Sequence, residues 1–281
     1  MKKTIAAKIL LSALVLLACC GKQGTRTLTD AQLQTASWDD ILRAARGTTV
    51  YWMHWRGDPA INKYVDEFVM KRMAELYGVT VVPIDGQGSA IYSKLLLDKQ
   101  AGVSANGKID VVWINGETFH QLRQSGLLYG PFAQRLPNYQ YVDTDNPIIK
   151  YDFEQPTDGY ESPWGSVQFA LIYNSEKVPD PPRTIPALKQ WIIAHPGRFT
   201  YDASFTGVTF MKTLLYGLSG GVAQFQGKYD SALYAQKIQL VWNFLNDLKP
   251  YLWKEGKTYP ENVAKLHSLF ANQEVYFTMS D

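Results

Sequence analysis

Hydrophobic and polar positions alternate most regularly near the middle of the chain, in the stretch S-P-W-G-S-V-Q-F-A-L-I-Y-N. Val167, Phe169, Leu171 and Tyr173 lie at every second position, a spacing that predicts a strand with one apolar face. Further α/β patterns lie on both sides of residues 162–174, which we call the hinge stretch. A strand that joins two such halves predicts a hinge with a ligand site beside it. The alternative is an ordinary sheet strand with a structural tryptophan.

Apolar periodicity before the hinge stretch predicts strands and helices in alternation. Ser37 and Asp40 resemble the start of a helix over residues 38–45. Asp58 and Pro59 are a typical N-cap and first residue of a second helix. The order β-α-β-α-β-α is typical of a mostly parallel sheet. The predicted strands are residues 48–54, 79–84 and 109–114, and the predicted helices after them are residues 59–77, 90–100 and 118–125.

Proline and glycine residues predict an irregular segment over residues 131–161 and further turns after the hinge stretch. The sequence stops at Asp281 directly after a predicted strand. We therefore expect the C-terminal part of the fold to be missing, and these 281 residues not to be stable alone. Beyond the hinge stretch the predicted helices are residues 186–194, 208–218, 229–248 and 262–270, and the predicted strands are residues 199–201 and 275–279.

Three predicted loops follow the carboxyl ends of strands and precede helices, at residues 55–58, 86–89 and 115–118. Ligands of open α/β sheets bind at such ends, where free N–H groups of helix N-termini also point. Each candidate has a structural alternative: a helix cap for Asp58, an ordinary turn for the glycine loop, and a first-turn charge for Glu117. The candidate binding residues of these loops are Trp55, Asp58, Gly88, Ser89, Asn115 and Glu117.

The hinge stretch and the second half add four candidates: Trp164, Tyr173, Asp202 and Thr206. A core position is the alternative for Tyr173. Tryptophan faces attract cations, and the carboxylates at the strand ends would neutralise one, whereas Arg56 is the only basic residue in the three loops. These residues favour a small organic cation, although helix N-termini favour anions.

The N-terminus has the pattern of a bacterial export signal. Three lysines precede an apolar segment over residues 9–18, which is too short to cross a bilayer. Its end, L-L-A-C, resembles a lipobox, which implies a signal peptide over residues 1–18, a lipid on Cys19 and a tether over residues 19–36. A cleaved, unmodified secretory peptide is the alternative. Cys20 is the only other cysteine, so the folded body has no internal disulfide.

Composition limits the other classes of function. Without the three lysines of the leader, 25 of the 28 basic residues remain against 26 acidic ones, so no basic field for nucleic acid is expected. The chain has 8 tryptophans and 17 tyrosines, which ligand-binding surfaces also use. The four histidines lack metal-ligand spacing, and neither a phosphate-binding loop nor a hydrolase nucleophile motif is present. We expect no metal and no cofactor. A hydrolase acting in the same cleft, or an adhesion module without a ligand, are the alternatives.

The runs Y-E-S-P-W-G and L-I-Y-N, with P-x-T at residues 182–184 and Trp191, resemble the extracellular solute-binding proteins of ABC importers. The resemblance covers nearly all of the mature chain. It is strongest to the YnjB-type branch, which is related to thiamine-, polyamine- and iron-binding proteins. It implies an α/β, two-lobe, type II periplasmic-binding-protein-like fold with hinge strands, a monomer that closes on a solute, and delivery to an importer permease. The implied segments are lobe 1 over residues 37–164, lobe 2 over residues 165–275, and the start of a return crossover over residues 276–281. The implied location is the periplasm or cell envelope.

Overall fold

The computed structural model describes residues 28–103, 107–165 and 167–281. The predicted signal peptide, Cys19 and most of the tether lie outside these ranges. The described chain forms two compact units, one ending at Ile114 and one running from Asn115 to Asp281. The lobe boundary expected at residue 164 stays a prediction. Within the described ranges, no helix combines the length and the apolar character needed to cross a membrane.

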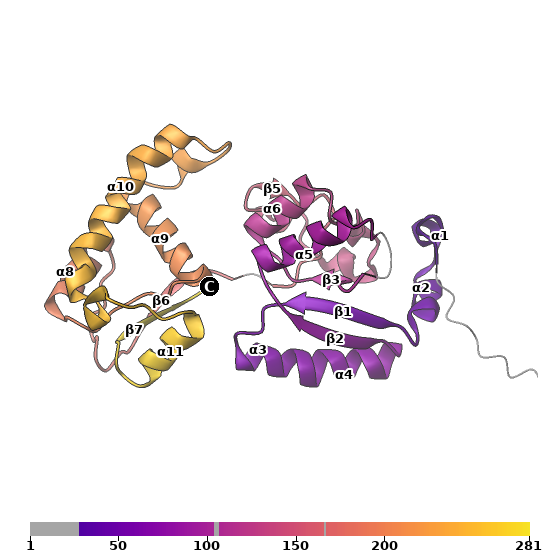
Figure 1. The fold of residues 1–281 in the computed structure, drawn as a ribbon, viewed down its shortest axis with the longest axis horizontal. Coiled ribbons are helices and arrows are strands. Elements are labelled where there is room, and N and C mark those ends of the chain that lie inside the picture. The colour runs from indigo at the N-terminus through magenta and orange to yellow at the C-terminus, as the bar shows by residue number, and fades with distance from the viewer. Residues whose placement is uncertain (1–27, 104–106, 166) are drawn as a thin grey trace, which may run out of the picture. The chain divides into compact units, whose positions relative to one another are not determined.

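The first unit is built on a parallel sheet with the strand order β2-β1-β3, as the alternating pattern predicts (Figure 1). The longest pairing matches β1 to β2 over six residues each, and it places His54 opposite Asp85. A small core packs the long helix against these strands through Trp52, Val65 and Val81. The elements are α1 (Asp30–Thr35), α2 (Trp38–Ala45), β1 (Thr49–His54), a continuous helix made of α3 (Pro59–Lys63), η1 (Tyr64–Val69), α4 (Met70–Arg72) and η2 (Met73–Tyr77), then β2 (Thr80–Asp85), α5 (Ser89–Gln100) and β3 (Val111–Val112).

Helix ends in this unit follow the local signals of the sequence. The hydroxyl of Ser37 accepts a hydrogen bond from the N–H of Asp40 at 3.2 Å and caps α2. Gly78 ends the long helix in the left-handed conformation, with φ 64°. The π-helical turns η1 and η2 inside that helix carry no signal in the sequence pattern. The third strand is much shorter than the predicted residues 109–114.

The second unit begins with α6 (Gly116–Gln124) and continues through short elements. The prediction of an irregular segment over residues 131–161 is wrong in part, because that segment contains helical turns and a hairpin. Hydrogen bonds between neighbouring residues, such as those of the Asn146 cap, form these short elements without long apolar periodicity. They are η3 (Ala133–Arg135), η4 (Pro137–Tyr141), α7 (Pro147–Lys150), β4 (Tyr151–Asp152) and β5 (Gln155–Pro156).

Two antiparallel strands, four α-helices and three short 3-10 helices form the rest of the second unit in the described ranges. β6 (Ala170–Tyr173) pairs with β7 (Phe277–Ser280), so the last predicted strand is confirmed one to two residues later. The strand predicted over residues 199–201 is wrong: these residues belong to no strand, and the carbonyl of Phe199 accepts an isolated bond from the N–H of Trp253 at 2.8 Å. The remaining elements are α8 (Ile185–Ala194), α9 (Phe205–Leu218), η5 (Ala223–Phe225), α10 (Ser231–Leu248), η6 (Lys249–Tyr251), η7 (Trp253–Gly256) and α11 (Val263–Ala271).

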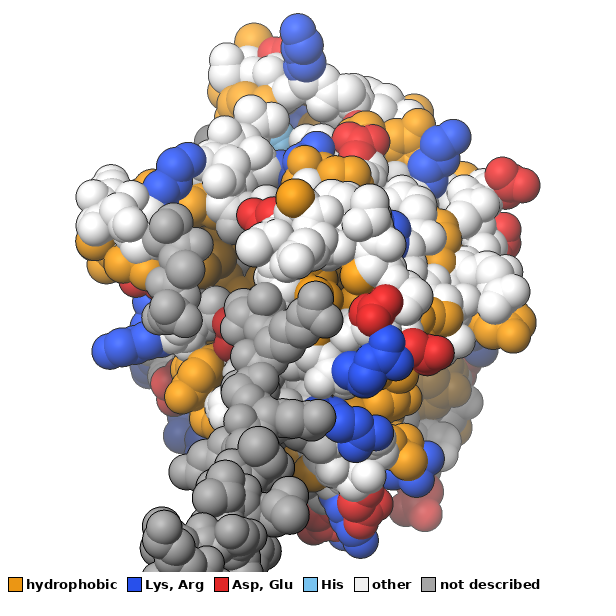
Figure 2. Space-filling model, turned by 90° about the vertical axis from the view of Figure 1, so that its right-hand side faces the viewer, with side chains coloured by type: hydrophobic (Ala, Val, Ile, Leu, Met, Phe, Trp, Pro, Cys, Tyr) orange, Lys and Arg blue, Asp and Glu red, His pale blue; other side chains and the backbone are white. Residues whose placement is uncertain are grey.

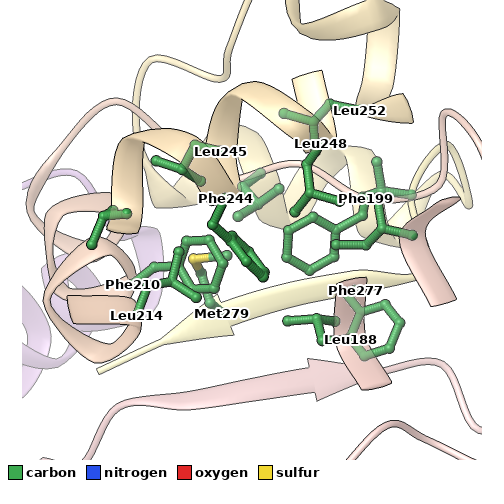
Figure 3. Close-up of a cluster of buried hydrophobic side chains, with 14 of the residues drawn as sticks. Leu188, Phe199, Phe210, Leu214, Phe244, Leu245, Leu248, Leu252, Phe277 and Met279 are labelled. Carbon is green, nitrogen blue, oxygen red and sulfur yellow. The ribbon is translucent and has the colours of Figure 1, made fainter. Parts of the chain in front are cut away.

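The core of the second unit lies where α9 and α10 cover β7 (Figure 3). Phe199, Phe210 and Met279 are at most 2% exposed. The rings of Phe199 and Phe277 lie 5.7 Å apart between centroids, within the range of favourable aromatic pairs. This packing includes both the strand at the end of the hinge stretch and the last strand of the described chain, because β6 pairs with β7.

Charges on the described surface are mixed. On the face drawn in Figure 2, basic (blue) and acidic (red) side chains are interspersed among uncharged ones, and neither sign covers a broad area outside the grey atoms. This face therefore offers no extended basic surface of the kind that binds a phosphate backbone.

Replacing Phe210 by alanine should destabilise the second unit by about 3–5 kcal/mol, because it leaves a cavity among buried side chains. The matched control is Val208→Ala on the same helix, since Val208 is 42% exposed and its loss should cost less than about 1 kcal/mol. Urea unfolding of the full-length protein measures both changes. Equal losses for the two variants would show that α9 is not packed as described.

Candidate functional site

Four candidate residues of the first unit lie at the carboxyl ends of the adjacent strands β1 and β2. Trp55 and Asp58 follow β1, while Gly88 and Ser89 begin α5 after β2. Asp58 caps α3, because its Oδ1 accepts the N–H groups of Ala60 at 2.7 Å and of Ile61 at 2.9 Å. The structure thus brings the four residues to one edge of the sheet and shows the capping role for Asp58.

A buried histidine directly precedes the loop over residues 55–58, and Arg56 in this loop forms an ion pair. His54 is fully buried, and burial lowers the pKa of its imidazole. Its Nδ1 lies 2.9 Å from the carbonyl oxygen of Trp55, which only accepts, so Nδ1 carries the proton and Nε2 accepts from Arg56 at 3.3 Å. Arg56 also donates two bonds to Asp66, at 3.0 and 2.7 Å. The only basic residue of the three loops is therefore already paired with a carboxylate.

The third predicted loop opens the second unit. Asn115 is exposed and makes no side-chain cap for α6, and the exposed Glu117 accepts a bond from Gln121 at 3.0 Å. The cap is supplied from elsewhere in the chain: Oδ2 of Asp152 accepts the N–H of Gly116 at 2.5 Å. An internal carboxylate thus occupies the N-terminus of this helix.

The carboxyl group of Glu161 lies near that of Asp152. Burial, followed by repulsion from Asp152, raises the pKa of Glu161 to about 8, and burial also raises the pKa of Asp152. Among the described residues no lysine or arginine forms an ion pair with either group. The sequence pattern does not indicate this pair of carboxyl groups, although Glu161 lies inside the run Y-E-S-P-W-G.

Asp202 and Thr206 lie together at the start of α9, and both are buried, at 1% and 5% exposure. Oδ1 of Asp202 accepts bonds from the N–H and hydroxyl of Ser204, at 2.8 and 2.5 Å. Its Oδ2 is buried with no hydrogen-bond partner among the described residues. Thr206 donates to Asp281 at 2.9 Å. Asp202 thus bonds the residue that precedes α9, and no side chain of the described residues caps the first N–H groups of that helix.

Two aromatic residues of the hinge stretch are exposed to solvent, whereas Phe169 packs against the core of the second unit. Trp164 is 53% exposed and Tyr173 is 38% exposed, with its ring 6.3 Å from that of Phe277. Strand pairing starts at Ala170, and Val167 is 76% exposed. The prediction that Val167 shares one apolar strand face with Leu171 is therefore wrong, because Val167 lies before the residues that strand pairing orients.

Other local features do not involve the candidates. A hollow of about 180 Å³ lies on the second unit, and its lining contains none of the predicted site residues. In the described part of the chain, no three histidine, cysteine, aspartate or glutamate side chains come together as a metal site. The hollow is lined by Gln134, Tyr139, Thr144, Ile149, Lys150, Tyr151, Pro156, Thr157, Asp158 and Gly159.

Two α/β units with polar and aromatic residues at strand ends define a periplasmic-binding-protein-like fold. A crystal structure assigned to an extracellular solute-binding protein from Bordetella parapertussis has the same fold. Its TM-score is 0.52 at 14% identity, over 83% of this chain and 64% of that one.

The sequence comparisons identify the family. The model of the bacterial extracellular solute-binding protein family matches residues 63–281. Protein YnjB of Escherichia coli (strain K12) is 36% identical over 250 residues, which cover 88% of this chain and 64% of that protein. This chain belongs to the bacterial extracellular solute-binding family, as the motifs around the hinge stretch predict. It spans 64% of the length of the two relatives named here.

The buried Glu161 predicts a pH dependence of stability. The pKa of Glu161 in the folded protein, about 8, lies above the ordinary glutamate pKa of 4.5, so between these pH values only the unfolded state loses the proton. Stability should therefore fall as pH rises through that window. The loss is on the order of 2 kcal/mol, because solvent screening reduces the roughly 1.4 kcal/mol per pKa unit.

Urea unfolding of Glu161→Gln at pH 5 and pH 8 tests this linkage. The variant should lose less stability than the natural protein over that range, because glutamine stays neutral. Glu261→Gln is the control at an exposed carboxylate, and it should keep the natural pH dependence. An unchanged slope in Glu161→Gln would contradict the assignment.

Proposed function

We propose that this protein captures a small organic cation, thiamine-like or polyamine-like, outside the cell membrane and delivers it to an ABC importer. The family supports solute binding, and it points to a binding protein rather than an enzyme. The class of solute rests on the charges of the candidate site.

One observation carries the cation: the chain's own carboxylates occupy two of the three helix starts at the predicted loops, whereas α5 has no side-chain cap among the described residues. Asp58 accepts bonds from the first N–H groups of α3, and Asp152 accepts one from the first N–H of α6. The dipoles of α3 and α6 are thereby countered by charges of the chain itself. The helix starts favour an anionic solute much less than the sequence pattern alone indicates.

The charges and aromatic faces of other candidate loops support the same class of solute. Arg56 is held by Asp66, so the loops offer no unpaired guanidinium. No described lysine or arginine forms an ion pair with Asp58 or Glu117. Trp164 exposes half of its surface, and an indole face attracts a cation by about 0.5–2 kcal/mol. Carboxylates and aromatic faces together are the groups that recognise organic ammonium ions.

Calorimetric titration of the full-length protein with thiamine, putrescine, sulfate and glucose 6-phosphate tests the solute class. One of the two cations should bind, and Trp164→Ala and Asp58→Asn should each weaken that binding by about tenfold, as loss of a charge or aromatic contact does. Asparagine is as good an N-cap as aspartate, so Asp58→Asn removes the charge and leaves α3 capped.

Trp38→Ala on α2 is the matched control for the loss of a partly exposed tryptophan, and it should bind as the natural protein does. Binding of sulfate or the sugar phosphate alone, unchanged by Trp164→Ala, would rule the cation out.

We also propose that Cys19 carries a diacylglyceryl anchor, because L-L-A-C ends a short apolar segment. Two acyl chains hold a protein stably at a membrane, whereas one does so weakly. Cys19→Ser should move the protein from the membrane to the periplasmic fraction, and Cys20→Ser should leave it at the membrane. Fractionation with intact-mass analysis measures both. A natural protein that begins beyond Cys20 without added mass would contradict the anchor.

A further inference from the structure

Arg56 lies in the loop that follows β1, and both its side chain and its backbone are held. The guanidinium donates two bonds to Asp66, on η1, at 3.0 and 2.7 Å, and Nη1 also donates to Nε2 of His54 at 3.3 Å. The N–H of Arg56 donates to Oδ1 of Asp85, at the end of β2, at 3.1 Å. Its carbonyl oxygen accepts a bond from Asn62 of α3 at 2.8 Å. Arg56 therefore ties this loop to two strand ends and to the long helix.

The bond between Arg56 and His54 requires a neutral imidazole. His54 is 0% exposed, and its Nδ1 donates a hydrogen bond to the carbonyl oxygen of Trp55 at 2.9 Å. Nε2 is then the ring atom that accepts from the guanidinium, whose own charge is permanent. A second proton on the ring would remove this acceptor and place two cations 3.3 Å apart. The contact with Arg56 is therefore lost when His54 is protonated.

The imidazole is enclosed by tryptophan rings and faced by one cation and two carboxylates. Its centroid lies 4.8 Å from that of Trp52, on the same strand, and 6.2 Å from that of Trp113, after β3. The charged groups that face it are Arg56 in the loop, Asp66 on η1 and Asp85 at the end of β2. Both carboxylates are exposed, so water screens their attraction for an imidazolium. Burial and the nearby guanidinium both disfavour the protonated ring, and the pKa of the imidazole is lowered.

Two candidate binding residues depend on the order of this loop. The indole ring of Trp55 lies against Gly57, where an added Cβ would overlap it. Asp58 ends the loop and caps α3 through Oδ1. Trp55 and Asp58 lie on either side of Arg56 in the chain. Release of Arg56 would therefore loosen the backbone that positions both the indole and the carboxylate.

We propose that Arg56 is a positioning residue that orders the loop over residues 55–58 for the solute, and that neutral His54 anchors it, so that the loop loosens when His54 takes up a proton. This inference rests on the proposed function, because it takes Trp55 and Asp58 to touch the solute. The ordered loop binds fewer protons than the loosened one. Its order is fully present above about pH 6.5, the ordinary pKa of histidine, and declines as the pH falls below that value.

Amide hydrogen exchange of the full-length, solute-free protein at pH 7.5 and pH 5.5 tests the anchor. The protection factor of the Arg56 N–H should fall about threefold to tenfold in acid, the upper bound being set by the one unit between pH 5.5 and the ordinary pKa of histidine. His54→Gln stays neutral and keeps an acceptor oxygen, so its loop should keep its protection at both pH values. His120→Gln, at an exposed histidine, is the control and should behave as the natural protein does. The same acid loss in His54→Gln, or no loss in the natural protein, would overturn the anchor.

Variants of Arg56 test the positioning role even if His54→Gln disturbs the core. Arg56→Met should lower the protection of the loop at pH 7.5 by about fivefold, because bonds between charged groups are lost. Arg56→Lys keeps the charge but lacks the planar fork that reaches two partners at once, so it should restore little of the protection. Arg72→Met, at an exposed arginine of α4, is the matched control and should leave the loop unchanged. Full protection in Arg56→Met, or full rescue by Arg56→Lys, would overturn the positioning role.

Titration with thiamine and putrescine at the same two pH values separates the loop from the solute class. If either compound binds, its Kd should rise in acid about threefold to tenfold for the natural protein, and much less for His54→Gln. Loop protection that falls in acid only where His54 is present, with neither compound bound, would support the anchor and contradict the cation. A bound cation whose Kd stays constant while loop protection falls would support the cation and overturn the positioning role.

Discussion

Carboxylates bonded to the first N–H groups of helices organise the polar edges of both units. Asp58 and Asp152 come from different places in the chain, yet each accepts a bond from the first N–H groups of a helix. An unpaired N–H at such a position is costly when buried, so these bonds fix where the neighbouring loops lie. The same bonds reduce the attraction of the α3 and α6 starts for an anion. In the second unit, Oδ2 of Asp202 is buried without a hydrogen-bond partner among the described residues.

The fold is largely readable from the sequence where the signals are local. Asp58, Pro59 and Gly78 mark both ends of a 19-residue helix correctly, because capping needs only neighbouring residues. The parallel sheet follows from strands that alternate with helices. The local signals fail where residues far away in the chain decide the structure. β3 has only two residues, and Val167 is exposed because the pairing of β6 with β7 begins at Ala170.

The candidate site was readable only in part, for the same reason. Positions at strand ends follow from topology, so Trp55 and Asp58 could be placed from the sequence. The Asp152 bond to Gly116 joins residues 36 apart in the chain, and the raised pKa of Glu161 depends on burial, so neither has a local signal.

Native mass spectrometry of the full-length protein, purified from its own cells without added ligand, tests the central claim most directly. The account predicts a co-purified compound whose mass and fragmentation identify an organic ammonium ion, present in the natural protein and depleted in Asp58→Asn. A retained phosphate, sulfate or carboxylate compound that is held equally by Asp58→Asn would contradict it.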